Sequence, residues 1–305
     1  MERETGPSRI DLHTHSTRSD GVLPPAELYR QMTSAGRRLV ALSDHDTLAG
    51  VRELRAAGSG APDSPSGESS GPRLIGAVEI NSLTDDPTLW EGELHILGFG
   101  MDEADAAFEA ALERQRAGRT VRVAEMLDRL RQLGMPIDEA FAAIVADADP
   151  NSIGRPHVAR AMIAAGHATS VDDAFARVLA RGQPGYVPRR GLGSRAAIEA
   201  IRAAGGLAVL AHFREAIERK FLIERLVHWG LGGLEVYYSG HGRPFTPAQV
   251  KAMAAFAKAR RLVATGGSDY HGDEMPYPEA TVELRVPDAV EAPFLAALDQ
   301  AWADR

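Results

Sequence analysis

Short apolar runs alternate with amphipathic segments along most of the chain. Seven runs of four to seven residues are apolar enough to form strands buried in a sheet. This alternation predicts an α/β fold. The predicted strands are Arg9–His13, Leu39–Ser43, Leu74–Ile80, Leu94–Phe99, Leu207–Ala211, Gly233–Tyr238 and Leu262–Thr265. The predicted helices between them include Pro25–Ala35, Ser194–Ala204, Glu215–Trp229 and Thr246–Arg260.

Two stretches interrupt this alternation. Residues 57–72 hold twelve Gly, Ser or Pro among sixteen, which predicts a surface loop. The other stretch shows helical periodicity and no convincing strand. Its apolar residues at helical spacing include Val123, Met126, Leu127, Leu130 and Leu133. Because the length suits one barrel plus an insertion, we predict a barrel built from residues 1–100 and 186–305, interrupted by a helical insertion, residues 101–185.

Composition narrows the class of protein. The 305 residues are 44% hydrophobic and 25% charged, which is ordinary for a globular chain. No apolar run approaches the ~20 residues of a membrane helix, and the first residues are polar, so we expect a cytoplasmic protein without a secretory signal. The absence of cysteine excludes disulfides, thiolate catalysis and cysteine-bound metals. A net charge of −8 argues against binding long duplexes by bulk electrostatics.

Histidines gather at the ends of the predicted strands. His13 and His15 end the first strand, and alternate residues of an extended chain point to the same side. Their two imidazoles can therefore converge on one divalent metal. Asp20 follows in a turn. The alternative is a pair of hydrogen-bonded histidines on a barrel rim.

Similar residue types occupy equivalent places on other strands. His45 follows the second strand, between Asp44 and Asp46, which could equally cap a helix or bond a loop. Glu79 lies within an apolar strand, where a buried carboxylate needs a metal or an arginine as its partner. His95 is embedded in the next apolar strand, and could be an ordinary core histidine. The remaining candidates are His212, Asp269 and His271.

These positions form one pattern. Six of the ten histidines and three acids lie at or near predicted strand ends, and unrelated structural histidines have no physical reason to gather there. The carboxyl ends of barrel strands meet at one rim, so we expect the nine side chains to converge. His167 and His228 fit no such pattern, and the roles of Asp44, Asp46, Glu235 and His241 stay open.

The motifs resemble, in order, those of the PHP (polymerase and histidinol phosphatase) family of metal-dependent phosphoesterases. The resemblance covers about residues 9–99 and 186–272. It implies a distorted (β/α)7 barrel with a trinuclear metal site at its C-terminal rim. It assigns the first metal to His13, His15, Glu79 and Asp269, the second to Glu79, His95 and His212, and the third to Asp20, His45 and His271. One departure is Phe213, where proline often follows the histidine.

The insertion carries a narrower resemblance. Gly154-Arg155-Pro156-His157, preceded by helical arginines, resembles the subgroup acting on nucleotides. That subgroup removes the 3′-phosphate of 3′,5′-bisphosphonucleotides or releases 5′-mononucleotides from short RNA. Arginine suits bidentate phosphate binding, although arginines on a helix surface are commonly only solvated. The predicted substrate-binding residues are Arg116, Arg119, Arg155 and His157.

Clustered divalent cations suit phosphoester hydrolysis. They can supply a hydroxide at neutral pH, neutralise the phosphoryl oxygens and stabilise the leaving group. Histidine and carboxylate ligands without sulfur accept Mn²⁺, Fe²⁺ or Zn²⁺, and we expect three ions, with Mn²⁺ first. We predict a nucleotide phosphoesterase using a metal-bridging hydroxide, on a small nucleotide or a short 5′-phosphorylated oligonucleotide. Its catalytic residues, acting through that hydroxide, would be Glu79, His212 and Asp269.

Three other functions compete with this one. A histidinol-phosphate phosphatase shares the chemistry but would not need the arginine-bearing insertion. An amidohydrolase also begins with a His-x-His strand but commonly bridges its metals with a carboxylated lysine, whereas Glu79 occupies the bridging place here. An inactive metal-binding accessory module would be expected to have lost ligands. The sequence leaves the oligomeric state open, and a monomer is compatible with it.

Overall fold

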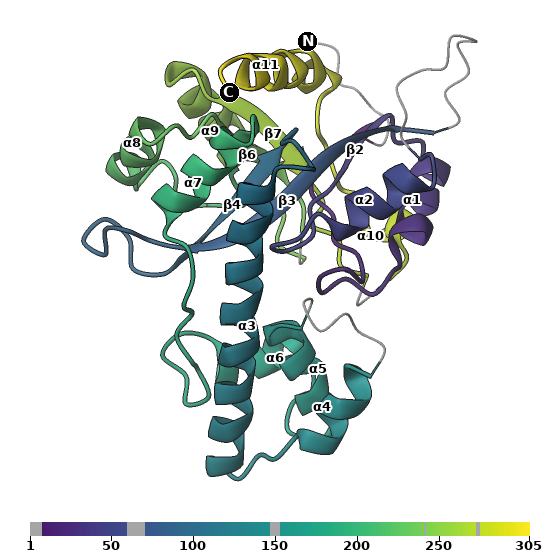
Figure 1. Ribbon diagram of the computed structural model, residues 1–305, viewed down its shortest axis with the longest axis vertical. Helices are drawn as coiled ribbons and strands as arrows, with labels where there is room; N and C mark the ends of the chain where they lie inside the picture. Colours follow the sequence, from purple (N-terminus) through teal and green to yellow (C-terminus); the bar gives the residue numbers. More distant parts are fainter. Residues whose placement is uncertain (1–7, 60–70, 147–152, 241, 273–274) are drawn as a thin grey trace.

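Seven strands form one sheet that curls into a nearly closed barrel (Figure 1). The computed structural model describes residues 8–59, 71–146, 153–240, 242–272 and 275–305. The strands follow chain order, and the barrel closes where the amide of Leu12 donates to the carbonyl of Gly266 at 3.1 Å. The predicted barrel is confirmed. The strands are β1 (Ile10–Asp11), β2 (Leu39–Leu42), β3 (Arg73–Leu83), β4 (Glu93–Phe99), β5 (Leu207–Leu210), β6 (Gly233–Tyr238) and β7 (Val263–Gly267).

The β4 strand is the irregular member of the barrel. It runs antiparallel to both β3 and β5, whereas the other neighbouring strands are parallel. Residues 84–92 hold no helix, so β3 returns directly into β4. Because β4 is reversed, its first residues lie at the rim where the other strands end. His95 therefore reaches that rim from the start of its strand.

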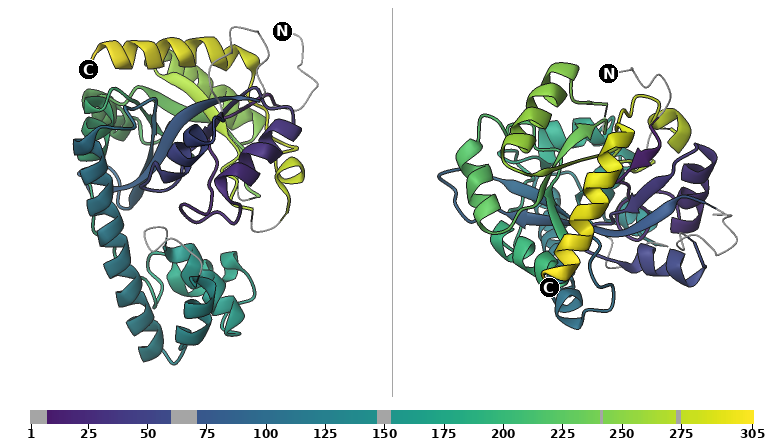
Figure 2. Two further views of the ribbon diagram at one scale, coloured as in Figure 1. Left: turned by 45° about the vertical axis from the view of Figure 1, so that its right-hand side comes forward. Right: turned by 90° about the horizontal axis from the view of Figure 1, so that it is seen from above.

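Helices pack around the barrel and close one end of it. The C-terminal helix α11 crosses the end at which the parallel strands begin (Figure 2). There Phe294 packs edge to face on Phe99, with ring centroids 5.2 Å apart. The opposite rim, where the parallel strands end, is not covered by α11. The barrel helices are α1 (Pro25–Ser34), α2 (Ala49–Ala56), α7 (Ser194–Ala203), α8 (Lys220–His228), α9 (Pro247–Ala259), α10 (Tyr277–Ala280) and α11 (Glu291–Ala303).

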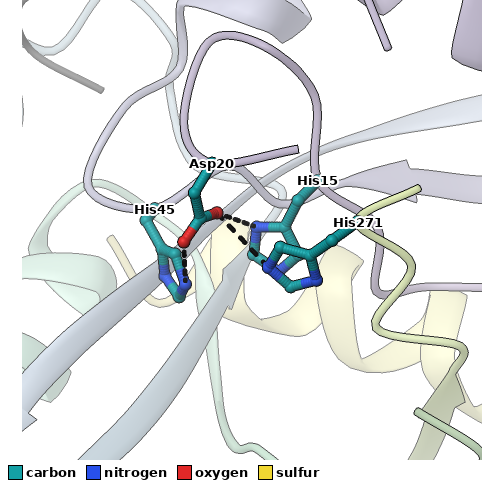
Figure 3. Close-up of side chains that lie close together, drawn as sticks. All are labelled: His15, Asp20, His45 and His271. Atoms are coloured by element: carbon teal, nitrogen blue, oxygen red, sulfur yellow. Dashed lines mark ion pairs between the residues drawn. The ribbon is translucent and has the colours of Figure 1, made fainter. Parts of the chain in front are cut away.

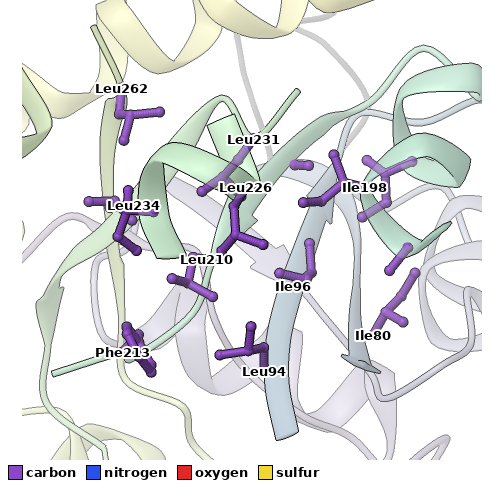
Figure 4. Close-up of a cluster of buried hydrophobic side chains, with 14 of the residues drawn as sticks. Ile80, Leu94, Ile96, Ile198, Leu210, Phe213, Leu226, Leu231, Leu234 and Leu262 are labelled. Atoms are coloured by element: carbon purple, nitrogen blue, oxygen red, sulfur yellow. The ribbon is translucent and has the colours of Figure 1, made fainter. Parts of the chain in front are cut away.

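The barrel strands are apolar because both of their faces are buried. One hydrophobic cluster fills the barrel and extends to α11. Another lies outside β4, β5 and β6, where Ile96, Leu210 and Leu234 pack against helices such as α7 and α8 (Figure 4). Side chains buried on both faces produce continuous apolar runs, which is why the strands stand out in the sequence.

The insertion between β4 and β5 is helical, as the sequence predicts. The long helix α3 (Ala106–Gln132) packs on the barrel through Phe108 and Leu112 and then runs away from it (Figure 1). Its second half carries Met126 and Leu130 into a separate hydrophobic cluster. The other elements of the insertion are α4 (Asp138–Ile144), α5 (Arg155–Ala164), α6 (Val171–Ala174) and the π-helical turn Phe175–Leu179.

One predicted helix starts later than expected, and one predicted loop lies mostly outside the described residues. The helix predicted from Glu215 begins only at Lys220, because residues 214–219 form turns. Most of the predicted loop, residues 60–70, lies outside the described residues, as does His241. The limits of the insertion remain a prediction. Within the described part of the chain, none of the helices has the length and apolar character needed to span a bilayer.

Candidate metal centre

The nine predicted side chains converge at the open rim of the barrel. They form three overlapping groups, and in each group one ligand-type atom per residue lies within 4.8 Å of all the others. The groups are His13, His15, Glu79 and Asp269; Glu79, His95 and His212; and His15, Asp20, His45 and His271. These match the sets implied by the resemblance, except that His15 also joins the third. Their role as metal ligands stays a prediction.

Glu79 lies at the centre of the cluster. One of its oxygens is within 3.3 Å of ring nitrogens of three histidines, and the other is within 3.1 Å of two more. Burial alone would raise the pKa of the Glu79 carboxyl, but the surrounding histidines hold it well below its usual range. A permanently ionised carboxylate suits a bridging position. The five histidines are His13, His15, His45, His95 and His212.

Asp20 organises a second part of the rim (Figure 3). Its carboxylate lies 3.3 Å from Nε2 of His271, 3.6 Å from Nε2 of His45 and 3.9 Å from Nδ1 of His15. Burial opposes ionisation, but the charges of His45 and His271 hold the pKa of Asp20 well below its usual range. One carboxylate with three converging imidazoles is a donor set suited to a divalent transition metal.

The donor set fits divalent cations. Four buried atoms in it have no hydrogen-bond partner, although each would cost ~1–3 kcal/mol if left unsatisfied. Burial alone would lower the pKa of His15, but the nearby carboxylates of Asp269 and Glu79 raise it to about 10. The carboxylates of the cluster thus produce a negative potential that would favour bound cations. The four atoms are Nε2 of His13, Nε2 of His15, Oδ1 of Asp20 and Nδ1 of His45.

A second layer of side chains holds the candidate ligands. Glu235 accepts from Nδ1 of His13 at 3.0 Å. Tyr238 donates to Asp269 at 2.9 Å. Asp44 accepts from the amide of Ser16 at 2.7 Å, so it holds the loop between β1 and α1 and is not placed as a ligand. The sequence alone leaves the roles of Glu235 and Asp44 open, and no pattern in it indicates Tyr238. Glu235 carries the same signal as Glu79, a carboxylate within an apolar strand.

Backbone strain concentrates at this site. Four non-glycine residues among those described have φ in the left-handed region, and three lie at the rim. They are Asp46 at 56°, His212 at 27° and Asp269 at 51°. Such conformations cost ~1–3 kcal/mol each and persist where surrounding contacts enforce them. The chain therefore stores strain at the residues that aim candidate ligands.

A cavity of about 1030 Å³ opens over the cluster, between the rim and the insertion. Its floor includes Glu79, His95 and His212, and its far wall includes Ile163 and Phe175. Cationic side chains are prominent among the residues that line it. These arginines are Arg119, Arg122, Arg155, Arg160, Arg189, Arg214 and Arg243. Such a cavity favours an anionic ligand that also has an apolar part.

The four predicted substrate-binding residues divide into two pairs. Arg119 and Arg155 line the cavity, where Arg119 pairs with Asp46 and Arg155 pairs with Glu93 at 2.8 Å. Arg116 instead donates to the backbone carbonyl of Asp46 at 2.9 Å. Nδ1 of His157 accepts from the amide of Gly154 at 3.2 Å, which caps α5. Neither Arg116 nor His157 is among the described residues that line the cavity.

Several residues that line the cavity are not predicted from the sequence. The buried Arg189 lies 3.7 Å from Asp46 and 3.6 Å from Glu93, and therefore joins the two carboxylates. Arg122 pairs with Glu93 at 3.0 Å. Asn81 lines the cavity two residues after Glu79, on the same face of β3. The i, i+2 spacing could have indicated Asn81, whereas no local sequence pattern distinguishes Arg189 from the other arginines of the chain.

Comparison with known proteins identifies the family. No family model matches the chain. It is 35% identical over 268 residues to a 5′-3′ exoribonuclease of Haemophilus influenzae, covering 86% of this chain and 90% of that protein. It is 32% identical over 274 residues to a 3′,5′-nucleoside bisphosphate phosphatase of Chromobacterium violaceum, covering 87% of each. The chain belongs to the PHP family of metal-dependent phosphoesterases.

Solved structures agree with this PHP assignment. A Bifidobacterium adolescentis protein, provisionally assigned as a metal-dependent phosphoesterase, superimposes with a TM-score of 0.77 at 28% identity, covering 97% of both chains. A Chromobacterium violaceum protein named an amidohydrolase, solved with sulfate and no metal, gives 0.78 at 29% identity, covering 96% of this chain and 97% of its own. As a PHP protein, this chain is a metal-dependent hydrolase of phosphate esters.

Proposed function

We propose that the protein hydrolyses nucleotide phosphate esters. It would remove the 3′-phosphate of 3′,5′-bisphosphonucleotides or release nucleotides from the 5′ end of short oligonucleotides. The observation that carries this proposal is the cluster centred on Glu79, which lies at the floor of a cavity lined by arginines. The names of the two relatives support both substrate types.

The chain's own residues define where cations would be held. We propose three, with Mn²⁺ as the expected ion, held by the three overlapping groups of the rim. When bound, such cations supply a deprotonated water at neutral pH and neutralise charge on the phosphoryl oxygens. Glu79 belongs to two groups and would fix the spacing between their ions. His212 and Asp269 would aim at the reacting phosphate from strained backbone positions.

The arginines provide a site for a second phosphate. Among the described residues, these four arginines pair with only two carboxylates, those of Asp46 and Glu93, so two positive charges are left over. The arginines are Arg119, Arg122, Arg155 and Arg189. Burial alone would raise the pKa of Glu93, but Arg155, Arg189 and Arg122 lower it to about 2, so it stays ionised. The uncompensated charge suits a phosphate dianion beside the metal cluster.

The central test is a hydrolysis assay with purified protein loaded with Mn²⁺. The panel contains 3′-phosphoadenosine 5′-phosphate, a 5′-phosphorylated oligoribonucleotide and histidinol phosphate. We expect turnover of the first two to exceed that of the third. Substituting both His13→Ala and Asp269→Ala removes two side chains of the first group and should abolish turnover. Undiminished hydrolysis by this double variant would show that the cluster is not the catalytic centre.

The role of the arginines that line the cavity is tested separately. Arg155→Ala should raise KM at least tenfold for a bisphosphonucleotide and change it little for an aryl phosphate, which has no second phosphate. Arg116→Ala is the matched control, since Arg116 contacts Glu109 and a backbone carbonyl rather than the cavity. Equal KM changes for both substrates would exclude a second-phosphate site at Arg155.

A further inference from the structure

Glu235 is a buried carboxylate that belongs to none of the three candidate metal groups. It lies on β6, between β5 and β7, and His212 and Asp269 each follow two residues after the end of one of these strands. One of its oxygens is 3.0 Å from Nδ1 of His13. The other accepts from the backbone amide of His212 at 2.7 Å. A single carboxylate therefore contacts residues of two different groups.

The contact with His13 fixes the tautomer of that ring. A carboxylate oxygen accepts, so the ring donates from Nδ1, and Nε2 is the ring atom left to bind a cation in place of a proton. That Nε2 lies 3.3 Å from oxygens of both Glu79 and Asp269 and makes no hydrogen bond. The bond to Glu235 thus presents His13 as a ligand toward the first group.

The contact with His212 acts on the backbone instead. His212 has φ of 27°, a conformation that its own side chain disfavours. The bond from its amide to Glu235 helps to hold this conformation, and the ring then places Nε2 3.1 Å from Glu79. Glu235 therefore also positions a member of the second group.

We propose that Glu235 is a positioning residue that sets the affinity of the first two cation sites and not of the third. The side chain of Glu235 contacts His13 and His212, and neither belongs to the third group, which is built around Asp20. The inference rests on the proposed function only for the premise that the rim binds cations. It predicts that one substitution weakens two sites together.

Glutamine is the informative replacement because both partners of Glu235 are donors. A glutamine offers one acceptor oxygen and one NH₂ group, which can only donate. It can satisfy His13 or His212, but its NH₂ then faces the other partner. If the NH₂ faces Nδ1 of His13, the ring proton moves to Nε2 and the lone pair is lost to the cation. Glu235→Gln therefore keeps the shape of the side chain but replaces one of its two acceptor oxygens with a donor.

The experiment is equilibrium dialysis of metal-free protein against buffered free Mn²⁺, with bound Mn²⁺ measured by elemental analysis. For Glu235→Gln we expect two of three equivalents to weaken by about 10- to 100-fold, the usual effect of losing such an orienting partner, and the third to stay within about twofold. Glu109→Gln is the control, because Glu109 pairs with Arg52 and Arg116, neither of which belongs to the three groups. Unchanged binding, or equal weakening of all three equivalents, would overturn the inference.

A spectroscopic measurement makes the result independent of activity. In Zn²⁺-loaded wild-type protein, nitrogen-correlated NMR should show the His13 ring proton on Nδ1, and in Glu235→Gln that signal should shift or disappear, because its acceptor is no longer a carboxylate. A proton on Nε2 in the wild-type protein would contradict the proposed role. If the wild-type protein binds cations but hydrolyses no nucleotide, the proposed function fails while the role of Glu235 is still decided by these two measurements.

Discussion

Identical side chains at the rim differ sharply in protonation because their surroundings differ. Burial lowers the pKa of His45 to about 3, so its ring is neutral and ready to act as a ligand. Burial also acts on His15, but the adjoining Asp269 and Glu79 raise its pKa to about 10. A cation that binds beside His15 must therefore displace a proton, whereas one that binds beside His45 need not.

This contrast predicts how metal affinity depends on pH. Below about pH 10 the metal-free protein holds a proton on His15, and each displaced proton makes apparent Mn²⁺ affinity rise about tenfold per pH unit. Affinity should therefore rise steadily between pH 7 and pH 9. Calorimetric titration at several pH values, in buffers of different ionisation enthalpy, measures both affinity and proton release. An affinity that is flat over this range would contradict the assignment of His15.

The raised pKa of His15 has the opposite effect on the stability of the metal-free protein, which should fall as the pH rises. The raised pKa of His15 stabilises the fold fully below its unfolded value of 6.5, and this contribution is lost as the pH rises through about 10. Metal-free protein should thus be weakened by alkaline conditions that favour metal binding. In the metal-free protein the protonated ring of His15 lies between the carboxylates of Glu79 and Asp269, and a bound cation would take over its charge.

Tyr238 offers a prediction at a single hydrogen bond. Burial, followed by the nearby charge of Asp269, raises the pKa of Tyr238 well above its usual range, so the phenol stays neutral and donates at 2.9 Å. Tyr238→Phe removes this donor from a strained residue, and we expect Mn²⁺ affinity to fall about tenfold. Equilibrium dialysis measures the loss. The slope of affinity against pH should not change, and a changed slope would contradict a non-titrating Tyr238.

At the scale of elements, the seam between β1 and β7 brings the first and last predicted ligands together. Gly267 ends β7, and a Cβ atom there would lie 2.3 Å from Cβ of His13. No side chain fits without moving β1. The glycine is needed for this close approach and not for its backbone angle, since its φ is not in the left-handed region.

Gly267→Ala should therefore destabilise the protein and loosen the cluster. Overpacking of this kind costs ~1–3 kcal/mol, and the shift of His13 should also lower Mn²⁺ binding. Thermal unfolding and metal content measure the two effects. Gly154→Ala is the matched control, because its nearest atoms would be at an ordinary 3.6 Å. Equal stability of the two variants would show that the seam yields without cost.

The strands could be predicted from the sequence because their signal, a short run of apolar residues, is local. The apolar run of Gly233–Tyr238 is predicted with the observed bounds, and Glu79 stands out as a charge within such a run. The reversed direction of β4 could not be predicted, since an apolar run carries no information on direction. Arg189 was missed because its importance arises from partners distant in the chain, Asp46 and Glu93.

At the scale of the whole molecule, the chain must hold its insertion over the barrel. The two parts have separate hydrophobic clusters, so apolar packing alone does not fix their relative position beyond the first turns of α3. Glu93 on β4 pairs with Arg122 on α3 and Arg155 on α5. This ion-pair network therefore ties the barrel to the far wall of the cavity.

Removing the carboxylate from this network tests the connection. Glu93→Gln leaves three arginines without their shared partner, and breaking a buried network of this kind costs ~3–5 kcal/mol. Arginines drive the pKa of Glu93 down to about 2 against the opposing effect of burial, so its contribution is complete above about pH 4.5 and lost as the pH falls toward 2. The difference in unfolding free energy between wild type and variant should thus be constant from pH 7 to 5 and shrink below 4.5.

Urea unfolding of the metal-free proteins across this pH range measures that difference directly. Glu199→Gln is the control, because Glu199 forms an exposed pair with Arg195 on one helix face and should leave the unfolding free energy nearly unchanged. If Glu93→Gln were equally neutral, the network would not bind the insertion to the barrel. If it were destabilising but independent of pH, shape rather than charge at Glu93 would hold the two parts together.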